Sequence, residues 1–586
     1  MAELVTEWNL EKYFYSSIHD ENLKKDLETY KSRSDAFIQK YKRNISNLSD
    51  DDFFLFLEEM DTLNLEIEKV LMYLGFVSSL DTQNQEVQKE TARIHKMISE
   101  YGEKFLFIDE EFKLMGFKRF EALAALDSPF KNYLRTTGVN LQYLLSQPEE
   151  KVIIKLGTAY SSNLYEELVT SFEFNFRGEK ISEDEVRTLR EDQDREKRKD
   201  AFKSLACVYL NKQNQIVLGN LYSLVCKDNV ADVELRKYNT VMSQRNISEE
   251  LSDETVDTLL KNVSENYLLY QKFLFKKAQI LELDKLETYD IYAPFPVIED
   301  VEGMPFEEGW ELYKRTIEKI DPELAAFSDE MLSGGRISVY PKEGKTSGAY
   351  ANYSQKIPEF ILLNWSDSPG DVATLAHEMG HAFHGYLSKK QKALVYNTPL
   401  TLAETASIFN ETLMFETLLE ITESKEERNR LICNRLDDIF STIFRQVAYV
   451  LFERRCHESF QRNEPLTFDD YNRMWAEEMK RLMGPDVNVD ESLIKHGWSS
   501  ISHIFQTPFY CYTYAFGNII SLNLYQNYKN SKDKEKFLNS YHEFLAAGGS
   551  DTPENLLKDI FDMKFDDSFY AIAFSNIDEL IKKLDQ

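Results

Sequence analysis

The residues best suited to chemistry in this 586-residue chain are two histidines in the run His377-Glu378-Met379-Gly380-His381. On a helix the two imidazoles are about 40° apart and project from one face. Two imidazole nitrogens in that arrangement can bind one tetrahedral Zn²⁺, and the intervening glutamate can reach a metal-bound water without binding the metal. The spacing therefore predicts a metal site with Glu378 as a general base.

The residues around this motif have the pattern of a helix that begins shortly before it. Ser368 followed three residues later by Asp371 is a capping signature, and Pro369 suits the first helical position. Four apolar residues recur at helical spacing on the face opposite the histidines: Val372, Leu375, Met379 and Phe383. We therefore expect an amphipathic helix that buries its apolar side and points both imidazoles into a cleft.

Other interpretations of these histidines are open at the level of the residues. They could lie on the surface of an ordinary helix, although the capped amphipathic pattern disfavours this. His384 lies on the same face and could be a ligand, but a packed residue or one that contacts a ligand is favoured. Metzincins need a third histidine at position 387, where this chain has Leu387, so that class is excluded.

A catalytic zinc needs a third protein ligand, and a segment rich in glutamate follows the motif. Glu404 and Glu411 are seven residues apart on one face of a predicted helix that is apolar nearly all round, which indicates burial. A metal ion or a metal-binding histidine would stabilise a buried carboxylate. We assign Glu404 as the ligand and Glu411 as the partner of a ligand histidine, although the two could exchange roles. Glu416 and Glu420 fall on another face and are expected in solvent or in salt bridges.

The charge of the chain excludes several classes of partner. It has 69 Lys and Arg against 100 Asp and Glu, a formal net charge of −31. Such a field repels phosphate backbones and anionic lipids, so neither nucleic acid nor a membrane is an expected partner. Five cysteines without CxxC pairs are typical of reduced thiols. Because there is also no signal-like N-terminus and no apolar run of about 20 residues, we expect a cytoplasmic protein.

Helical periodicity dominates the chain, and its few Pro and Gly residues (14 and 21) agree with long helices. Residues 172–181 alternate aromatic and polar side chains before a turn at Arg177-Gly178, and are a strand candidate. Residues 288–309 contain three prolines and predict an extended connector. Short β-rich runs within residues 333–365 predict a small sheet just before the motif helix. The expected fold is therefore mainly α with a small sheet beside the motif.

Several longer runs make the chain resemble the oligoendopeptidase F family and, more distantly, the thimet oligopeptidase-like zinc peptidases. They are GKTSGAYANY, PEFILLNWSDSPGDVATLAHEMGHAFHGYLS, LAETASIFNETLM and PFYCYTYAFG, with DIYAPFP as a further match. The resemblance covers about residues 195–580. It implies a two-lobed helical molecule with a deep central channel. It also suggests a helical accessory region (1–190) and a catalytic zinc-peptidase region (191–586).

This resemblance implies an activity and a cofactor. The family hydrolyses internal bonds of short peptides and uses one zinc ion per chain. Folded proteins are not its substrates, because only unstructured chains enter its channel. At the matching positions, His377, His381 and Glu404 would hold the zinc, and Glu378 would be the general base. The expected partners are therefore short peptide substrates.

The family also uses a histidine and tyrosines near its C-terminus to bind substrate and to stabilise the transition state. The matching segment here is 502–514, where His503, Tyr510 and Tyr514 are the implied catalytic residues. Tyr512 is the alternative to these tyrosines and is also expected to contact substrate. Taken alone, the aromatic alternation of this segment favours a packed strand or a core stripe over a site, and the resemblance reverses that preference.

A glycine-containing run before the motif has two interpretations. Residues 344–346 (GKT) look like the end of a phosphate-binding loop, but Val339 stands where that loop needs glycine, so an NTPase is excluded. In the resembling family, the strand around Gly348, Ala349 and Tyr350 lines the channel and pairs with the substrate backbone. Such pairing gives affinity that does not depend on the peptide's sequence.

Two rival functions share most of these features. Helical zinc carboxypeptidases also combine HExxH with a later glutamate, and peptides blocked at both ends would distinguish them from an endopeptidase. A catalytically inactive peptide-binding protein is the alternative from another class, but the motif glutamate and all three expected metal ligands are present. Ligands with nitrogen and oxygen donors also suit Mn²⁺ or Co²⁺, although zinc is the expected metal.

Overall fold

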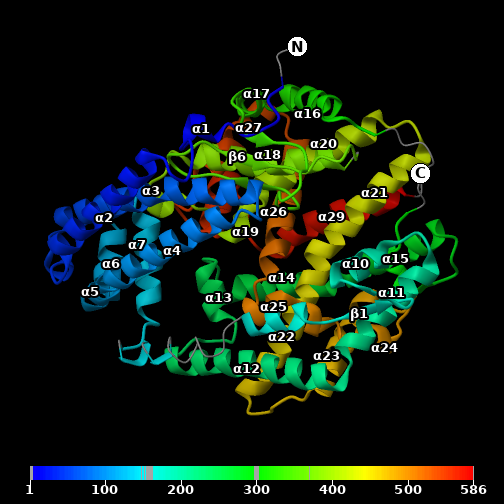
Figure 1. The fold of residues 1–586 in the computed structure, drawn as a ribbon. Helices are drawn as coiled ribbons and strands as arrows, with labels where there is room; N and C mark the ends of the chain where they lie inside the picture. The colour runs from blue at the N-terminus through cyan, green and yellow to red at the C-terminus, as the bar shows by residue number, and fades with distance from the viewer. Residues whose placement is uncertain are drawn as a thin grey trace. The chain divides into compact units, whose positions relative to one another are not determined.

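The structure is a computed structural model, and it describes residues 4–146, 148–150, 152–153, 163–295, 303–368 and 370–584. Helices form most of this part of the chain, and its strands have at most three residues each (Figure 1). The predicted mainly α fold is confirmed. None of the helices in these ranges is both long and apolar enough to span a membrane.

The chain divides into two compact units, each built from three separate segments. Unit 1 contains Met1–Leu144, Glu302–Leu418 and Asn527–Asp562, and unit 2 contains Leu145–Val301, Leu419–Gln526 and Met563–Gln586. These units do not follow the predicted division at residue 190, because each of them takes segments from both sides of it. The division into accessory and catalytic regions concerns function and stays a prediction, as does the channel.

Unit 1 consists of helices around one three-stranded sheet. Its helices are α1 (Leu10–Tyr13), α2 (Glu21–Tyr41), α3 (Asp50–Leu80), α4 (Gln85–Phe105), α5 (Phe107–Met115), α6 (Phe117–Ala124), α7 (Lys131–Leu141), α16 (Phe306–Ile320), α17 (Pro322–Ser333), α18 (Asp371–Ser388), α19 (Leu400–Ala403), α20 (Thr405–Ile421), α27 (Lys534–Ala546) and α28 (Pro553–Phe561). Its strands are β4 (Ile337–Ser338), β5 (Tyr350–Asn352) and β6 (Phe360–Leu362). Central β6 runs parallel to β4 and antiparallel to β5. The predicted sheet is confirmed, with β5 at one edge.

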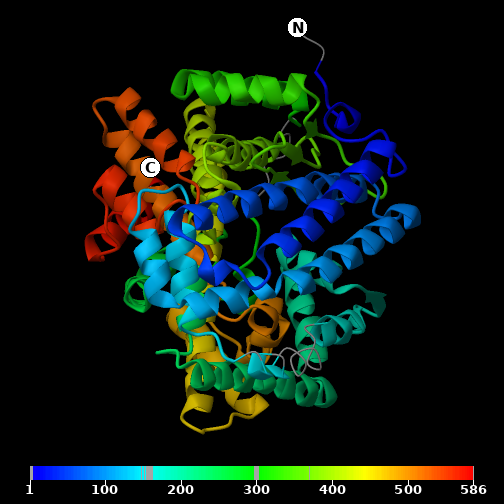
Figure 2. The same ribbon diagram turned by 90° about the vertical axis from the view of Figure 1, so that its left-hand side faces the viewer.

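The N-terminal helices of unit 1 support this sheet. Helices α2, α3 and α4 lie side by side (Figures 1 and 2). The Trp8 indole donates hydrogen bonds to the backbone carbonyls of Arg336 (3.1 Å) and Ile361 (2.8 Å). Phe360 of β6 packs on Phe76 of α3, with ring centroids 4.9 Å apart. Because α18 contacts β5 and β6, these helices also brace the element that carries the HExxH motif.

Unit 2 consists of helices with two small strand pairs. Its helices are α9 (Asn163–Thr170), α10 (Glu183–Thr188), α11 (Arg195–Tyr209), α12 (Lys212–Arg236), α13 (Ser243–Ser248), α14 (Asp253–Glu265), α15 (Tyr267–Ile280), α21 (Lys425–Ile439), α22 (Arg445–Gln461), α23 (Phe468–Met483), α24 (Glu491–Ile494), α25 (Ser502–Gln506), α26 (Tyr512–Asn530) and α29 (Asp567–Lys583). Its strands are β1 (Phe174–Phe176), β2 (Glu179–Ile181), β3 (Leu286–Glu287) and β7 (Val487–Asn488). A π-helical turn, Phe440–Phe444, precedes α22.

The predicted strand and turn at 172–181 are confirmed as the hairpin β1–β2. The strands pair antiparallel, with Asn175 opposite Lys180. Arg177 and Gly178 both have positive φ, 53° and 96°. A two-residue hairpin turn of the primed type needs this conformation, which Gly adopts without strain.

The predicted connector at 288–309 is described in part. Thr288–Asp290 form a 3₁₀ turn, and α16 begins at Phe306. Residues 296–302 lie outside the described ranges. The described ends agree with a break in the helical pattern at this point.

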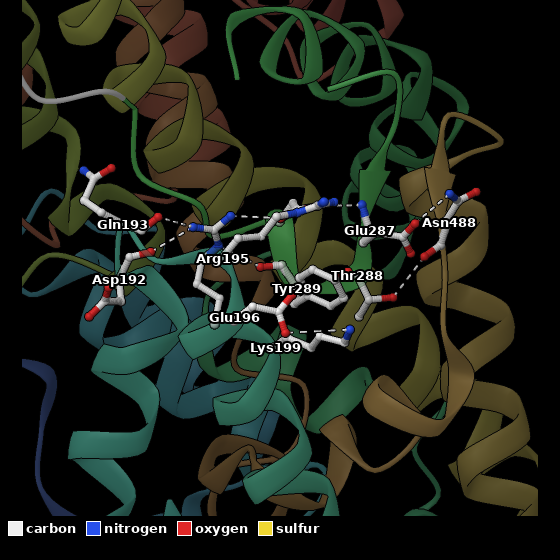
Figure 3. A network of polar contacts seen from close by, with 11 residues as sticks. Asp192, Gln193, Arg195, Glu196, Lys199, Glu287, Thr288, Tyr289 and Asn488 are labelled. Atoms are coloured by element: carbon white, nitrogen blue, oxygen red, sulfur yellow. Dashed lines mark hydrogen bonds and ion pairs between the residues drawn. The ribbon is translucent and has the colours of Figure 1, made fainter. Parts of the chain in front are cut away.

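The 3₁₀ turn lies in a network of polar contacts in unit 2, in which Glu287 and Thr288 bond Asn488 (Figure 3). Asp290 is fully buried and accepts hydrogen bonds from Arg195 Nη2 (2.6 Å), Arg198 Nη2 (2.9 Å) and the Glu287 N–H (2.9 Å). Burial raises the pKa of Asp290, but the bonds from Arg195, Glu287 and Arg198 bring it below its ordinary value. The carboxylate therefore fastens this turn to α11.

We expect Asp290→Ala to destabilise unit 2 by about 3–5 kcal/mol, because it leaves two guanidinium groups without their buried carboxylate. Glu173→Ala is the control, since its ion pair with Lys180 is exposed (73% and 72%) and should be worth no more than about 1 kcal/mol. Urea unfolding followed by circular dichroism measures both. Because the folded pKa is depressed, the Asp290 contribution should be present above about pH 4 and fade as pH falls through the folded pKa. Equal unfolding midpoints for the two variants would contradict this account.

Candidate metal centre and catalytic residues

The motif helix α18 begins where the sequence predicts, but its cap is different. Gly370 is the N-cap and makes no side-chain capping bond. Asp371 instead reaches back, and its carboxylate accepts hydrogen bonds from the N–H groups of Ser366 (2.7 Å) and Ser368 (3.1 Å). The predicted cap by Ser368 is therefore wrong, because the Ser368 hydroxyl is engaged with the N–H of Gly370 (3.3 Å). Pro369 lies outside the described residues.

The rest of α18 is anchored along its apolar face and at its C-terminal end. The predicted apolar residues are each at most 1% exposed: Val372, Leu375, Met379 and Phe383. At the C-terminus, the Lys389 ammonium lies 2.5 Å from a carboxylate oxygen of buried Glu359, which also pairs with Arg336 at 3.1 Å. The helix is thus fixed against the sheet by its own side-chain contacts.

A glycine inside the motif lets α18 touch α20. A Cβ atom on Gly380 would lie 2.5 Å from the Ala406 carbonyl oxygen and 2.6 Å from Ser407 Cα. Real Cβ atoms essentially never come so close to backbone atoms, so any side chain here would push the helices apart. This contact brings Glu404, which directly precedes α20, next to the motif histidines.

Three side chains of unit 1 converge at this point. Glu404 Oε2 lies 3.5 Å from His377 Nε2 and 3.3 Å from His381 Nε2. The two imidazole rings have centroids 4.9 Å apart and an interplanar angle of 78°. One ligand atom from each residue lies within 4.8 Å of the other two, and no further group of this kind occurs within the described ranges.

The Glu404 carboxylate is held ionised by its neighbours. Burial alone raises its pKa, but the hydrogen bond from His381 and the charges of both histidines lower it to about 2. Ser407 adds a hydroxyl donor 2.8 Å from Oε2. Glu404 is therefore a carboxylate with a fixed orientation at any physiological pH.

Glu411 contacts the other side of His377, a predicted ligand. Its Oε2 lies 3.2 Å from His377 Nδ1, as expected if Nδ1–H donates and leaves Nε2 free for a metal. Burial lowers the pKa of His377, but the hydrogen bond with Glu411 and the charges of Glu404 and Glu411 outweigh it and raise the pKa. Glu404 thus faces both Nε2 atoms, whereas Glu411 faces one Nδ1.

The chemistry of this donor set fits a divalent cation. With Glu411 bound to Nδ1–H, His377 Nε2 carries a lone pair that points at a carboxylate oxygen. Such an arrangement is repulsive unless a proton or a cation lies between the atoms. Two imidazoles and one carboxylate form the ligand set of many catalytic zinc sites, which keep a fourth position open. The expected zinc is therefore compatible with these residues.

Glu378 lies between the two histidines in the sequence but is not one of the converging ligands. Its side chain is buried, with 6% of the residue exposed. Burial raises its pKa, and the charges of His377 and His381 and a hydrogen bond with the Ala351 backbone only partly oppose this effect. A carboxylate with a raised pKa beside the candidate metal site is suited to accept and return a proton, as predicted for Glu378.

His384, the alternative ligand, is outside this group. It is 2% exposed, and its Nε2 lies 3.2 Å from the hydroxyl of Thr398. Burial lowers its pKa to about 3, so the ring is neutral. This packing agrees with the favoured interpretation of His384 as a packed residue.

The implied C-terminal catalytic residues lie in unit 2 and contact one another. His503 on α25 stacks with Tyr510 (centroids 5.8 Å, 13°), and Tyr514 on α26 meets both rings at 6.3 Å and 5.3 Å. His503 is exposed, and both tyrosines are half-buried. The segment forms two helices joined by a turn, so the strand interpretation of its alternating pattern is wrong. The aromatic side chains nevertheless gather in one accessible cluster.

Tyr512 differs from these tyrosines because it faces the interior of unit 2. The residue is fully buried, and its hydroxyl donates to Asn246 Oδ1 at 2.9 Å. Burial raises its pKa well above the ordinary value. A substrate could not reach the Tyr512 hydroxyl in this conformation. Tyr510 and Tyr514 are therefore favoured for the roles implied by the resemblance.

The run implied to bind the substrate backbone leads into edge strand β5. Gly348 is exposed, and its carbonyl accepts a hydrogen bond from Asn364 Nδ2 at 2.7 Å. Ala349 is partly exposed. The Tyr350 hydroxyl donates to Ser79 Oγ at 2.8 Å, so only its backbone is suited to the implied role. Pairing of this strand with a peptide stays a prediction.

Two residues of the metal centre are absent from the sequence-based site. Gly380 could have been found, because glycine inside an otherwise strong helix indicates close packing. Ser407 carries no such signal, since a serine at the start of a helix has many uses. Its role depends on the placement of Glu404 one turn earlier.

Comparison with known proteins gives a consistent result. Residues 188–572 of the chain match peptidase family M3. The chain is 27% identical over 529 residues to the group B oligopeptidase PepB of Streptococcus agalactiae, covering 85% of this chain and 84% of the relative. It is 26% identical over 552 residues to oligoendopeptidase F (plasmid) of Lactococcus lactis subsp. cremoris, covering 90% and 89%. The solved structure of oligoendopeptidase-F from Enterococcus faecium shares the fold, with a TM-score of 0.70, 22% identity and coverage of 95% and 98%.

These matches bear on the interpretation of the sequence as a whole. They confirm the resemblance to the oligoendopeptidase F family, and they confirm the enzyme class, a metalloendopeptidase. The individual site residues are not tested by them, and each remains a prediction.

We expect Gly380→Ala to weaken metal binding, because its methyl group would force α18 and the start of α20 apart and withdraw Glu404 from the histidines. Zinc affinity, measured by competition with a chromogenic chelator, should fall by about 10- to 100-fold, the range seen when supporting residues of metal ligands are lost. Gly102→Ala on α4 is the control, because a Cβ there meets nothing within 4 Å. Unchanged affinity in a folded Gly380→Ala protein would show that the helix contact does not set the ligand geometry.

Proposed function

The chain belongs to peptidase family M3, and we propose that it is a zinc-dependent endopeptidase that hydrolyses internal bonds of short peptides. The observation that carries this proposal is the convergence of His377 Nε2, His381 Nε2 and Glu404 Oε2, with Glu378 buried beside them. The expected substrates follow from the relatives, whose names describe oligopeptidases and oligoendopeptidases.

In this proposal His377, His381 and Glu404 hold one zinc ion per chain. Bound zinc supplies a Lewis acid that acidifies water and polarises the peptide carbonyl. Glu411 orients His377 through Nδ1, and Ser407 orients Glu404. These contacts hold His377 and Glu404 each in one orientation, so these two ligands need little rearrangement when the metal binds.

Glu378 is the proposed general base. It accepts a proton from the attacking water and then delivers this proton to the leaving amine. Its raised pKa supports the role, because a stronger base accepts the proton more readily and a buried acid returns it within the site. The hydrogen bond with Ala351 keeps the carboxylate next to edge strand β5.

The remaining groups are proposed to bind the peptide. The backbone of Gly348, Ala349 and Tyr350 would pair with the substrate main chain at the open edge of the sheet. His503, Tyr510 and Tyr514 would hydrogen-bond the substrate and stabilise the oxyanion, with Tyr510 as the favoured donor. Tyr512 is assigned no direct contact, because its hydroxyl is engaged with Asn246.

An internally quenched peptide, blocked at both ends, tests the reaction. We expect cleavage at an internal bond that a chelator abolishes and added zinc restores. Release of residues only from peptides with a free end would instead assign the protein to the carboxypeptidases. Binding without cleavage of either peptide would assign it to inactive peptide-binding proteins.

Glu378→Gln tests the general base. We expect kcat to fall on the order of 10²–10⁴-fold while the bound zinc, measured by mass spectrometry of metals, stays at the wild-type level. The control is Glu420→Gln, an exposed residue of α20, which should leave both values unchanged. Substantial turnover by Glu378→Gln would remove Glu378 from the proton transfer.

Tyr510→Phe tests the oxyanion donor. Loss of the hydroxyl should lower kcat on the order of 10²–10³-fold, as for other oxyanion donors, while the ring keeps its stacking on His503. Steady-state kinetics with the blocked peptide measures the effect. A loss below tenfold would move this role to Tyr514, and Tyr514→Phe provides that comparison.

A further inference from the structure

The turn that presents Tyr510 is strained. The Tyr510 N–H donates to the Thr507 carbonyl at 3.2 Å, which closes a four-residue turn with Pro508 second and Phe509 third. Phe509 has a φ of 63°, in the left-handed region. A turn with proline second and positive φ third normally has glycine or asparagine there. A bulky aromatic residue keeps this conformation only where its surroundings impose it.

Two contacts hold Phe509 in place. Its ring is 1% exposed and packs on His457 of α22, with centroids 4.7 Å apart. Its backbone N–H donates to Glu453 Oε1, also on α22, at 2.8 Å. Within the described chain, no side chain other than Glu453 accepts a hydrogen bond from the Phe509 N–H.

Glu453 is an unusual residue for this position because it is fully buried without a salt bridge in the described chain. Its second oxygen, Oε2, has no hydrogen-bond partner there. Burial raises its pKa to about 8, which the Phe509 N–H and the charge of Arg245 only partly oppose. The other titratable groups that face it are thiols and a phenol: Cys226, Cys456, Cys511 and Tyr222. Burying even a neutral carboxyl with one oxygen unpaired costs folding free energy. A contribution to stability alone therefore does not explain why a glutamate occupies this position.

The same turn is held from another side by α13. The Arg245 guanidinium lies 5.8 Å from the centre of the Tyr510 ring, and its Nε lies 3.5 Å from the Pro508 carbonyl oxygen. The Tyr510 ring in turn stacks on His503. A change in the Phe509 backbone therefore moves Tyr510 directly, since the two residues are adjacent in a single tight turn.

We propose that Glu453 is a positioning residue for the reaction: by accepting the Phe509 N–H it fixes the strained turn that places the Tyr510 hydroxyl. This inference rests on the proposed function, in which Tyr510 donates to the oxyanion. Glu453 itself touches no substrate. It acts through one backbone hydrogen bond.

Two nearly isosteric variants separate this role from general stability. Glu453→Gln keeps an oxygen that can accept the Phe509 N–H, and it resembles the neutral carboxyl. Glu453→Met fills similar space but leaves that N–H without an acceptor. We expect Glu453→Gln to retain kcat within about threefold, and Glu453→Met to lose about 10- to 100-fold in kcat with little change in KM, as small misplacements of catalytic groups do.

A double-mutant cycle with Tyr510→Phe gives the decisive readout. If Glu453 acts through the Tyr510 hydroxyl, Glu453→Met should cost less than about threefold once that hydroxyl is absent. An undiminished loss in the Tyr510→Phe background would overturn the proposal while leaving the role of Tyr510 intact. If Tyr510→Phe alone leaves kcat unchanged, the oxyanion role itself is wrong, and the positioning role is withdrawn with it.

A matched control and a second variant keep the result interpretable. Glu478 is another acid of unit 2 whose side chain is mostly buried. Its Oε1 accepts a hydrogen bond from the Tyr267 hydroxyl (2.9 Å), away from the turn. Glu478→Ala should lower thermal stability and leave kcat unchanged. If Glu453→Met does not fold, Arg245→Met loosens the same turn at Pro508 and enters the same cycle. A kcat loss in Arg245→Met that persists unchanged without the Tyr510 hydroxyl would likewise contradict positioning.

Discussion

The contact between the backbones of α18 and α20 is the constraint on which the metal centre depends. Gly380 allows the two helices to touch at Ser407, and no other residue would fit there. Because Glu404 directly precedes α20, this contact puts its carboxylate within 3.5 Å of both imidazoles. The HExxH spacing supplies two of the proposed ligands on one helix face, but the third, Glu404, reaches them only because the helices pack so closely.

Buried and half-buried carboxylates recur in this chain, and their partners decide their state. Glu404 faces two histidines, Asp290 faces two arginines, and Glu359 pairs with a lysine and an arginine. For Glu404 and Asp290 these partners lower the pKa despite burial. Glu453 has a backbone N–H instead, and burial raises its pKa to about 8. The same carboxyl group is therefore suited to be a proposed metal ligand, a structural anchor or a hydrogen-bond acceptor, according to the charge around it.

Local periodicity predicted much of the fold and of the candidate site, whereas contacts between distant segments did not follow from it. The motif helix and the sheet before it depend on spacing along the chain. Glu404 was expected to share a helix face with Glu411, but it lies in the turn between α19 and α20, and both residues still reach His377. The cap of α18 was predicted wrongly, because Ser368 and Asp371 can bond the backbone in either direction. The role of Glu453 was not predicted, since an acid within an apolar helix face shows burial without showing which backbone N–H it meets.

The most direct test of the account is a crystal of the zinc-loaded protein measured on both sides of the zinc absorption edge. The account predicts one anomalous peak per chain, within bonding distance of His377 Nε2, His381 Nε2 and a Glu404 oxygen, at about 2.0–2.2 Å. Glu411 should stay bound to His377 Nδ1 and not reach the metal. A peak bound by Glu411 in place of Glu404, or no peak between the two histidines, would contradict it.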